Sequence, residues 1–237
     1  RLAALRLAPL QCMAWGHPIS SGLSTIDLFL TSEAMEPEDS ADQYTEERVL
    51  MPGLSLCLRP PVEITEGLTR GGLQLPEDCV IAICCQTLSK YRPEHDHVWI
   101  EIAQRSPELR LVFIADPSPV VTEAFGMRLA SAFQESGLRM QDHVQIIPRL
   151  KEGAYLDLNR VADLYLDSIG WSGGNTTIEA LHHGLPIVTT PGTTMRSRHT
   201  AAILSHLGLD PHVSADVPSY IERACQLIAD PDLRSQT

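Results

Sequence analysis

From Cys79 to the end of the chain, short apolar runs alternate with segments whose apolar residues recur every three or four positions. This alternation predicts strand and helix in turn. The expected strands span 79–86, 109–116, 144–150, 163–168 and 185–192. The expected helices lie around 97–105, 122–135, 155–162, 176–183, 198–207 and 219–229. Because the strands are apolar on both faces, they favour a parallel sheet covered by helices on both sides, a doubly wound α/β fold.

The part of the chain before Cys79 has a different pattern. Residues 1–16 resemble the tail of a helix that enters a strand, and "TIDLFLTS", 25–32, predicts another strand. An acidic surface stretch follows at 33–47, and residues 52–78 are rich in Gly and Pro, which is typical of a linker. We expect residues 1–60 to be the end of an incomplete first α/β half, 61–78 a linker, and 79–237 a complete second half. The missing initial Met suggests a piece of a longer protein.

Composition narrows the classes of function. Hydrophobic residues make up 43% and charged residues 20% of the chain, which suits a packed soluble domain. We expect no membrane span and no signal peptide, because no apolar run is long enough. The net charge of -12 argues against nucleic acid as a partner. The six scattered cysteines fit neither a zinc pattern nor a disulfide framework, so we predict reduced core thiols and a cytoplasmic protein.

Polar residues follow two of the predicted strands, where ligands of open parallel sheets bind. Gln86 and Lys90 come directly after the first strand. Lys90 can neutralise a phosphate, although a solvated surface lysine is the simpler interpretation. After the third strand, the backbone near Leu150 can contact a flat heterocycle and Tyr155 can pack on it, or the segment is only a loop that begins a helix.

The stretch "GGNTTIEALHHGLPIVTTPG" is the most informative one. Gly173 and Gly174 allow a ligand to approach the backbone closely, and residues 175–177 are expected to cap the next helix. The free N–H groups and the positive dipole end of that helix suit a diphosphate. Glu179, one turn further, can accept hydrogen bonds from ribose hydroxyls, or it is an ordinary first-turn carboxylate. Together with Gln86 and Lys90, the stretch predicts a nucleotide diphosphate.

Two further segments leave their chemistry open. Arg198 begins the next predicted helix and is either an anion ligand or a structural arginine. His95 and His97 flank Asp96, but the sequence shows no further cluster of metal-ligand residues to support a metal site. We therefore predict no metal site and no cofactor other than the nucleotide-sugar substrate.

These residues, in this order, resemble the O-GlcNAc transferase family, which comprises inverting glycosyltransferases of the GT-B fold. "LAPLQCMAWGHPISSGLSTIDLFLTSE" and "DQYTEERVLMPG" are similar to the family's segments before the domain crossover. "GGNTTIEALHHGLPIVTTPGTTMRSR" is similar to its nucleotide-binding signature and is the most specific match. Family members often have His or Gly at position 174 and Thr at 175, where this chain has Gly174 and Asn175. Ile19 stands where the family usually has Gly beside the sugar.

The resemblance implies a role for each candidate residue. Gln86 and Lys90 contact the diphosphate, and Lys90 stabilises the departing UDP as the catalytic residue. Leu150 and Tyr155 border uracil, and Glu179 binds the ribose. The phosphates or the sugar are held by Gly173, Gly174, Asn175 and Thr176.

The function predicted from this resemblance is the transfer of GlcNAc or another hexose from a UDP-sugar to Ser or Thr of a protein, with inversion and without a metal. The general base and a set of tetratricopeptide repeats are expected upstream of Arg1. His17 in "GHPISSG" is also similar to the bacterial protein N-glucosyltransferases of the family, which use UDP-glucose. A GT-B epimerase acting on a UDP-sugar, and a non-catalytic UDP-sugar-binding or interaction module, are the remaining alternatives.

Overall fold

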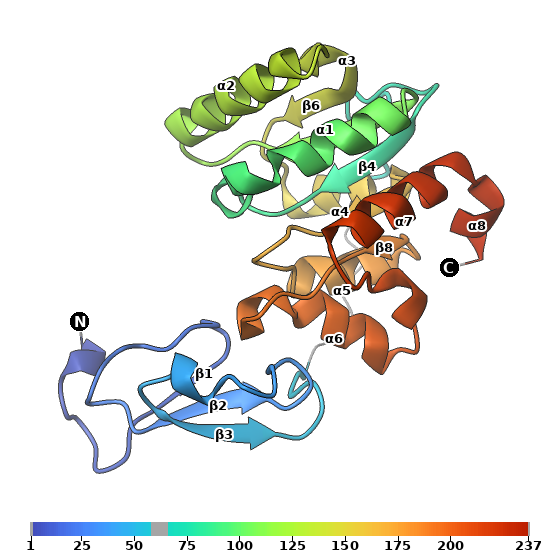
Figure 1. Cartoon of the computed structure of the whole chain (residues 1–237). Helices are drawn as coiled ribbons and strands as arrows, with labels where there is room; N and C mark the ends of the chain where they lie inside the picture. The colour runs from blue at the N-terminus through green and yellow to red at the C-terminus, as the bar shows by residue number, and fades with distance from the viewer. Residues whose placement is uncertain (1, 58–65, 237) are drawn as a thin grey trace.

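Two separate parallel sheets organise the chain in a computed structural model, which describes residues 2–57 and 66–236 (Figure 1). The small sheet has the order β1-β2-β3 and is formed by β1 (Cys12–Ala14), β2 (Leu28–Ser32) and β3 (Glu47–Met51). The large sheet has the order β6-β5-β4-β7-β8. Its strands are β4 (Val80–Cys84), β5 (Leu109–Ile114), β6 (Val144–Ile147), β7 (Leu164–Leu166) and β8 (Ile187–Val188).

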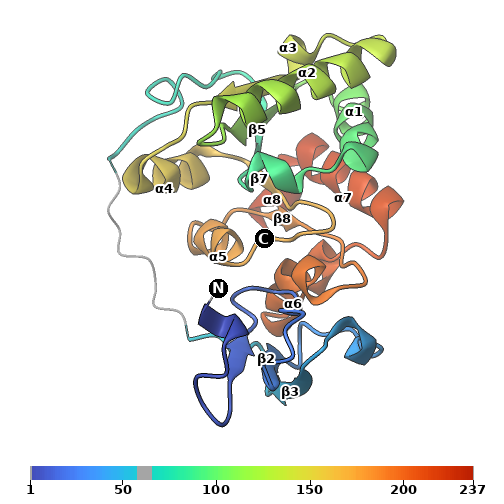
Figure 2. The ribbon, with the colours of Figure 1, turned by 90° about the vertical axis from the view of Figure 1, so that its left-hand side faces the viewer.

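Helices cover both faces of the large sheet. Helices α1 (Asp96–Arg105), α2 (Pro119–Glu135) and α7 (Val217–Ala229) share one hydrophobic cluster. Helices α4 (Glu152–Val161), α5 (Asn175–His182) and α6 (His199–His206) contribute to the cluster on the other face. Figure 2 shows α4 and α5 on one side of the sheet and α1 and α7 on the other. The two short helices are α3 (Met140–His143) and α8 (Pro231–Ser235).

Side chains of the central strand alternate between these two layers. Ala82 and Cys84 pack in the cluster with α1, α2 and α7, whereas Ile81 and Ile83 pack in the cluster with α4 and α5. All four are fully buried, as the period of two along a strand requires when both faces are covered. The doubly wound α/β fold predicted from the apolar strands is confirmed.

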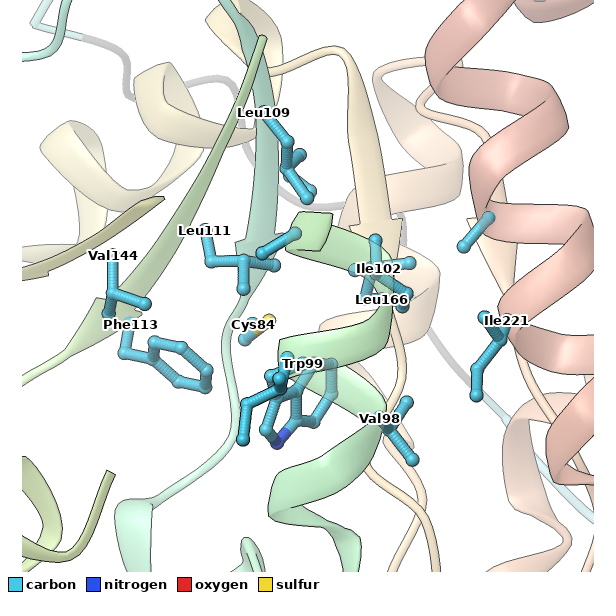
Figure 3. Packing of buried hydrophobic residues seen from close by; sticks show 14 of the residues in the cluster. Cys84, Val98, Trp99, Ile102, Leu109, Leu111, Phe113, Val144, Leu166 and Ile221 are labelled. Carbon is cyan, nitrogen blue, oxygen red and sulfur yellow. The ribbon is translucent and has the colours of Figure 1, made fainter. Parts of the chain in front are cut away.

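Aromatic rings fill the first cluster, part of which is seen in Figure 3. The ring of Phe113 lies 5.1 Å from that of Tyr91, 5.8 Å from that of Trp99 and 5.0 Å from that of Phe125, measured between centroids. Edge-on and tilted arrangements at these distances are favourable beyond the area that they bury. Phe113 therefore joins β5 to both α1 and α2.

The N-terminal part differs from its expected elements in one respect. Strand β3 lies between the predicted acidic stretch, 33–47, and the Gly- and Pro-rich segment, 52–78, where the sequence predicted no strand. Its apolar run is only three residues long, from Val49 to Met51, and these residues stay partly or largely exposed, so its parallel pairing with β2 defines the strand. The cysteines also divide, because Cys84 and Cys225 are buried whereas Cys12 and Cys57 are exposed, so the prediction of core thiols is wrong for these last two.

The predicted linker at 61–78 falls partly on residues 58–65, which lie outside the described residues. From residue 66 onward it packs against the large sheet. Leu73 and Leu75 are buried in the cluster with α4, and Arg70 pairs with Asp163 at 2.7 Å. No described helix, in 2–57 or 66–236, has the length and apolar character that crossing a bilayer requires.

Helix α6 joins the two sheets. In both views it lies between the small sheet and the large one (Figures 1 and 2). Met35 from the small sheet's side packs with Met195, Ala202 and Ile203 in a third cluster, with Trp15 at its margin. The ring of Trp15 also lies edge-on to a residue of α6, His199, with centroids 5.4 Å apart.

Removing the Phe113 ring tests this account of the core. We expect Phe113→Ala to lower the free energy of unfolding by about 3–5 kcal/mol, because it leaves a cavity between three other rings. Val120→Ala is the control, since Val120 on α2 is 73% exposed and its loss should stay within about 0.5 kcal/mol. Urea denaturation of both variants measures the difference. Similar small losses would contradict the proposed role of the ring.

Candidate nucleotide-sugar site

The carboxyl ends of β4 to β7 meet at one edge of the large sheet, and the loop between β7 and α5 occupies that edge. Asp167 anchors this loop. Its Oδ1 accepts a hydrogen bond from the Gly173 N–H at 2.8 Å, and its Oδ2 accepts one from Thr189 Oγ1 at 2.8 Å. Burial raises the pKa of Asp167 to about 6, although these hydrogen bonds oppose the shift.

Gly173 fits where no other residue does. A Cβ there would lie 2.6 Å from Thr177 Oγ1, 2.7 Å from Thr176 Oγ1 and 2.9 Å from Tyr165 Oη. The loop can therefore pass close to the start of α5 only because Gly173 has no side chain. This explains the first glycine of the pair by packing.

The start of α5 differs from the expectation that residues 175–177 cap it. The N-cap is Gly174, which makes no side-chain cap hydrogen bond, and Asn175 is the first helical residue. The hydroxyl of Thr177 instead pairs with that of Thr200 at 2.7 Å. A glycine N-cap leaves the first N–H groups of the helix without a side-chain acceptor, which is the arrangement that an anion can use.

Gln86 links the two halves of the predicted site. Its Nε2 donates to Thr176 Oγ1 at 2.5 Å and to Tyr165 Oη at 3.0 Å, and its Oε1 accepts from Lys90 Nζ at 2.7 Å. Gln86 is 5% exposed. The end of β4 and the first turn of α5, 90 residues apart in sequence, are thus joined by one buried amide.

Lys90 lies beside this amide and over the indole of Trp171, with 5.3 Å from Nζ to the ring centroid. Burial lowers the pKa of Lys90, and the negative charge of Asp167 partly offsets that shift. Within the described part of the chain, Lys90 forms no ion pair with a carboxylate. It is therefore a half-buried cation available to an anionic ligand.

A pocket of about 250 Å³ opens at the ends of β4, β5 and β6. Its lining brings together three of the predicted residues, Gln86, Leu150 and Tyr155. The Tyr155 hydroxyl is buried and makes no hydrogen bond of good geometry to a described residue. Cys85 and Arg149 also line this pocket.

Glu179 is placed next to the same pocket. Burial raises its pKa, a neighbouring Tyr155 hydroxyl lowers it, and the like charge of Glu152 raises it further. Glu152 and Tyr155 both line the pocket, so the α5 carboxylate faces the side on which a ribose is predicted. The structure thus joins Gln86, Lys90 and the start of α5 by hydrogen bonds, and it brings Leu150, Tyr155 and Glu179 together at the pocket that Gln86 also lines.

Three residues near the site were not predicted from the sequence as ligand residues. The sequence placed Asp167 in a predicted strand, Trp171 in a loop and His199 within the predicted helix 198–207, and it assigned no ligand role to any of them. His199 is 6% exposed, its Nδ1 is 3.8 Å from where a Gly174 Cβ would lie, and its Nε2 has no hydrogen-bond partner among the described residues. Burial, and then the charge of Lys90, lower the pKa of His199 to about 4.

Two of the residues whose roles were left open make contacts within the fold. Arg198 donates from Nη1 to the Gly192 carbonyl at 3.2 Å. Asp96 pairs with Arg128 at 2.8 Å, and the described residues bring together no group of three His, Cys, Asp or Glu that could hold a metal. A larger hollow of about 860 Å³ between α1 and α7 is lined by His97 but by none of the predicted donor-site residues, and its Arg105 pairs with Glu101 and Glu222.

Comparison with known proteins decides the family. The sequence model of glycosyl transferase family 41 matches residues 62–237. The chain belongs to glycosyl transferase family 41. Within this family it corresponds to the C-terminal catalytic region of the O-GlcNAc transferases, as the resemblance predicted.

Relatives share the likeness over nearly the whole chain. A Solanum lycopersicum protein named "Probable UDP-N-acetylglucosamine--peptide N-acetylglucosaminyltransferase SPINDLY" is 29% identical over 228 residues, 96% of this chain and 24% of that protein. The Arabidopsis thaliana protein of the same description named SEC is 25% identical over 231 residues, 94% of this chain and 23% of its own length. The chain thus spans about a quarter of these family 41 relatives.

Solved structures establish the fold. A mutant of the Thermobaculum terrenum O-GlcNAc transferase has a TM-score of 0.82 and 26% identity, covering 98% of this chain and 43% of that one. The lipopolysaccharide glycosyltransferase WaaG has a TM-score of 0.56 at 14% identity, covering 92% of this chain and 58% of its own. The GT-B assignment for this family 41 chain is therefore confirmed.

The neutral imidazole of His199 predicts a pH dependence of stability. The folded-state pKa of about 4 lies below the value of roughly 6.5 for an exposed histidine, so the unfolded chain binds more protons between these two values. Stability linked to His199 is present above about pH 6.5 and falls as the pH decreases toward 4. Asp167 acts in the opposite direction between about pH 6 and 4, because its folded pKa is raised, so a variant is needed to isolate His199.

We expect His199→Asn to lower the free energy of unfolding by roughly 2 kcal/mol more at pH 7 than at pH 5, because only the wild type loses the contribution on acidification. Urea denaturation at the two pH values measures this difference. His206→Asn, at the exposed C-terminal end of α6, is the matched control and should have a small effect at both. An equal loss for His199→Asn at both pH values would show that the imidazole is not held neutral.

Proposed function

We propose that this chain binds a UDP-sugar and that the protein containing it transfers GlcNAc or another hexose to Ser or Thr hydroxyls of proteins, with inversion. The observation that carries the proposal is the junction of Lys90, Gln86 and the glycine-capped start of α5 at one strand edge. The family 41 match and the names of the relatives support a UDP-GlcNAc donor and a protein acceptor.

The diphosphate lies, in this proposal, at the start of α5. The glycine-capped first turn of α5 presents free N–H groups and the positive dipole end of an eight-residue helix, which favour a phosphate. Lys90 Nζ reaches the same place through its bond to Gln86, and Asn175 and Thr176 offer polar side chains. In this proposal the Lys90 ammonium and the positive end of the α5 dipole both act on the β-phosphate rather than on the nucleoside.

The uridine extends from there along the rim to the pocket of about 250 Å³. Leu150 and Tyr155 border the base, and the half-buried carboxylate of Glu179 accepts hydrogen bonds from the ribose hydroxyls. A desolvated carboxylate gains most from such donors, because burial has removed its water.

The chemistry needs stabilisation of the departing UDP. Negative charge grows on the β-phosphate as the bond to the anomeric carbon breaks, and a preorganised cation and helix dipole stabilise it more in the transition state than in the ground state. Lys90 has this role in the proposal, and no protein-bound metal is required. The acceptor-binding surface, the general base and the tetratricopeptide repeats are proposed to lie elsewhere in the parent protein.

UDP and UMP distinguish the proposed diphosphate site from a simple nucleoside pocket. By calorimetry we expect the chain to bind UDP more tightly than UMP, and Lys90→Ala to weaken UDP about 10-fold or more while changing UMP little, because a charge-assisted bond to the β-phosphate is lost. Arg139→Ala removes one exposed cation from the start of α3, where it pairs with Asp142, and is the control. If Lys90→Ala weakened UDP and UMP by the same factor, the assignment of Lys90 to the β-phosphate would be wrong.

Analogues of the ribose test Glu179. The wild type should prefer UDP to an analogue lacking both ribose hydroxyls, and Glu179→Ala should abolish that preference, since the lost charged hydrogen bonds are worth about 1.5–3 kcal/mol. Glu152→Ala, which removes the neighbouring carboxylate, should keep the preference. If Glu179→Ala still prefers UDP to the analogue as strongly as the wild type does, the Glu179 carboxylate does not bind the ribose and only stabilises the start of α5.

A further inference from the structure

Arg196 is attached to the predicted phosphate loop. It lies in the single turn Met195–Ser197, which Thr194 and Ser197 close with reciprocal side-chain bonds to the backbone. The backbone carbonyl of Arg196 accepts a hydrogen bond from the Ser172 N–H at 2.9 Å. The arginine is therefore held directly beside the residues that lead into Gly173.

The guanidinium of Arg196 has no acceptor within 2–57 or 66–236. It forms no ion pair with a described carboxylate, and its buried Nε makes no hydrogen bond. Among the described residues, the guanidinium lies over the ring of Trp171, at 5.0 Å from Cζ to the centroid. Burying part of an unpaired charge raises the free energy of the folded state, because the charge loses water without gaining a partner. A bound anionic ligand would supply that partner.

Lys90 approaches the same ring. Its Nζ lies 5.3 Å from the Trp171 centroid, so two cations without carboxylate partners share one indole next to Gly173. Attraction to the ring holds each of them there, but it does not neutralise their mutual repulsion. The buried Asp167 near Lys90 offsets only part of the two positive charges. In a chain of net charge -12, the remaining local excess of positive charge favours one kind of occupant, an anion.

The surroundings leave room for that occupant. Arg196 lines a pocket of about 290 Å³, whose opposite wall comes from the N-terminal segment and includes Ile19 and Tyr44. His199, near Lys90, adds no third positive charge at neutral pH, because its pKa is lowered to about 4. The two cations thus lie between the start of α5 and a pocket large enough for part of a ligand.

We propose that Arg196 binds the β-phosphate of the nucleotide donor together with Lys90, and that Trp171 positions both cations. This inference rests on the proposed function, in which the rim binds a nucleoside diphosphate. Arg196 would be a second cation, beside Lys90, that stabilises the negative charge of the departing nucleotide. Arg196 would then be a donor-binding residue and Trp171 a positioning residue.

The test compares UDP with UMP on the whole chain by calorimetry. We expect Arg196→Gln to weaken UDP about 10-fold or more and UMP less than about 3-fold, and Arg196→Lys to recover part of the loss, because the lysine keeps the charge without the fork. Arg139→Gln removes an equal charge from an exposed pair and should change neither affinity more than about 2-fold. Thermal unfolding of each variant checks that the Met195–Ser197 turn is intact.

Trp171 supplies an independent measurement. We expect Trp171→Leu to weaken UDP although it removes no charge, and Trp171→Phe to restore most of the affinity, because a phenyl ring still attracts both cations. UDP should also change the tryptophan fluorescence of the wild type, and Trp171→Phe should abolish most of that change. A fluorescence response that is unaltered in Trp171→Phe would count against the placement of the anion.

The outcomes separate this inference from the proposed function. If the wild type bound UDP no more tightly than UMP, the proposed diphosphate site itself would be overturned. If UDP is preferred and Lys90→Ala weakens it, but Arg196→Gln behaves like Arg139→Gln, only the assignment of Arg196 is overturned. A third arm compares UDP-glucose with UDP-glucuronate: a loss in Arg196→Gln confined to the glucuronate would place the anion on the sugar and overturn the assignment to phosphate.

Discussion

The hydrogen bonds to the buried Asp167 are the constraint on which the site depends. Its carboxylate holds the Gly173 N–H and the Thr189 hydroxyl, and its backbone carbonyl accepts from Tyr220 Oη at 2.9 Å. One residue at the end of β7 therefore joins β8, α7 and the loop that leads to α5. Because a buried carboxylate without these donors would be strongly destabilised, the loop conformation and the position of the α5 start are determined together.

The loop in turn sets the electrostatics of the rim. Gly173 brings the chain close enough for Gln86 to bond Thr176, and Gln86 holds Lys90 beside the helix start. The chain carries an acidic excess overall, yet Lys90 and Arg196 lie at this edge without carboxylate partners among the described residues. A small preorganised positive region suits one anionic group, whereas a nucleic acid requires a broad basic surface.

The small sheet completes the surroundings of the rim through α6. Trp15 packs edge-on to His199, and the Gln43 side chain donates to the Thr193 carbonyl at 2.9 Å. Glu46, buried near this junction, accepts from Ser20 and Ser21 and has its pKa lowered to about 2, because these hydrogen bonds outweigh its burial. The loop that contains Ile19 is thereby fixed opposite Arg196, and the pocket between them belongs to both parts of the chain.

Local patterns were sufficient for the elements of the large sheet. Strands buried on both faces have continuous apolar runs, and helices have a period of 3.6, so each of these elements had a signal within its own segment. The same holds for the glycine pair before α5. Strand β3 had no such signal, because its half-exposed residues are defined by pairing with β2 rather than by burial. The capping expected of 175–177 also failed, since Thr177 is engaged by Thr200, which is 23 residues away.

The sequence by itself therefore determined the doubly wound α/β fold and the strand edge at which the candidate polar residues lie. Only the tertiary structure decided which of these groups act together. Asp167, Trp171, Arg196 and His199 had no distinguishing pattern, because their environment comes from residues distant in sequence. Burial, hydrogen-bond satisfaction and unpaired charge are properties of the packed chain, and a linear pattern does not contain them.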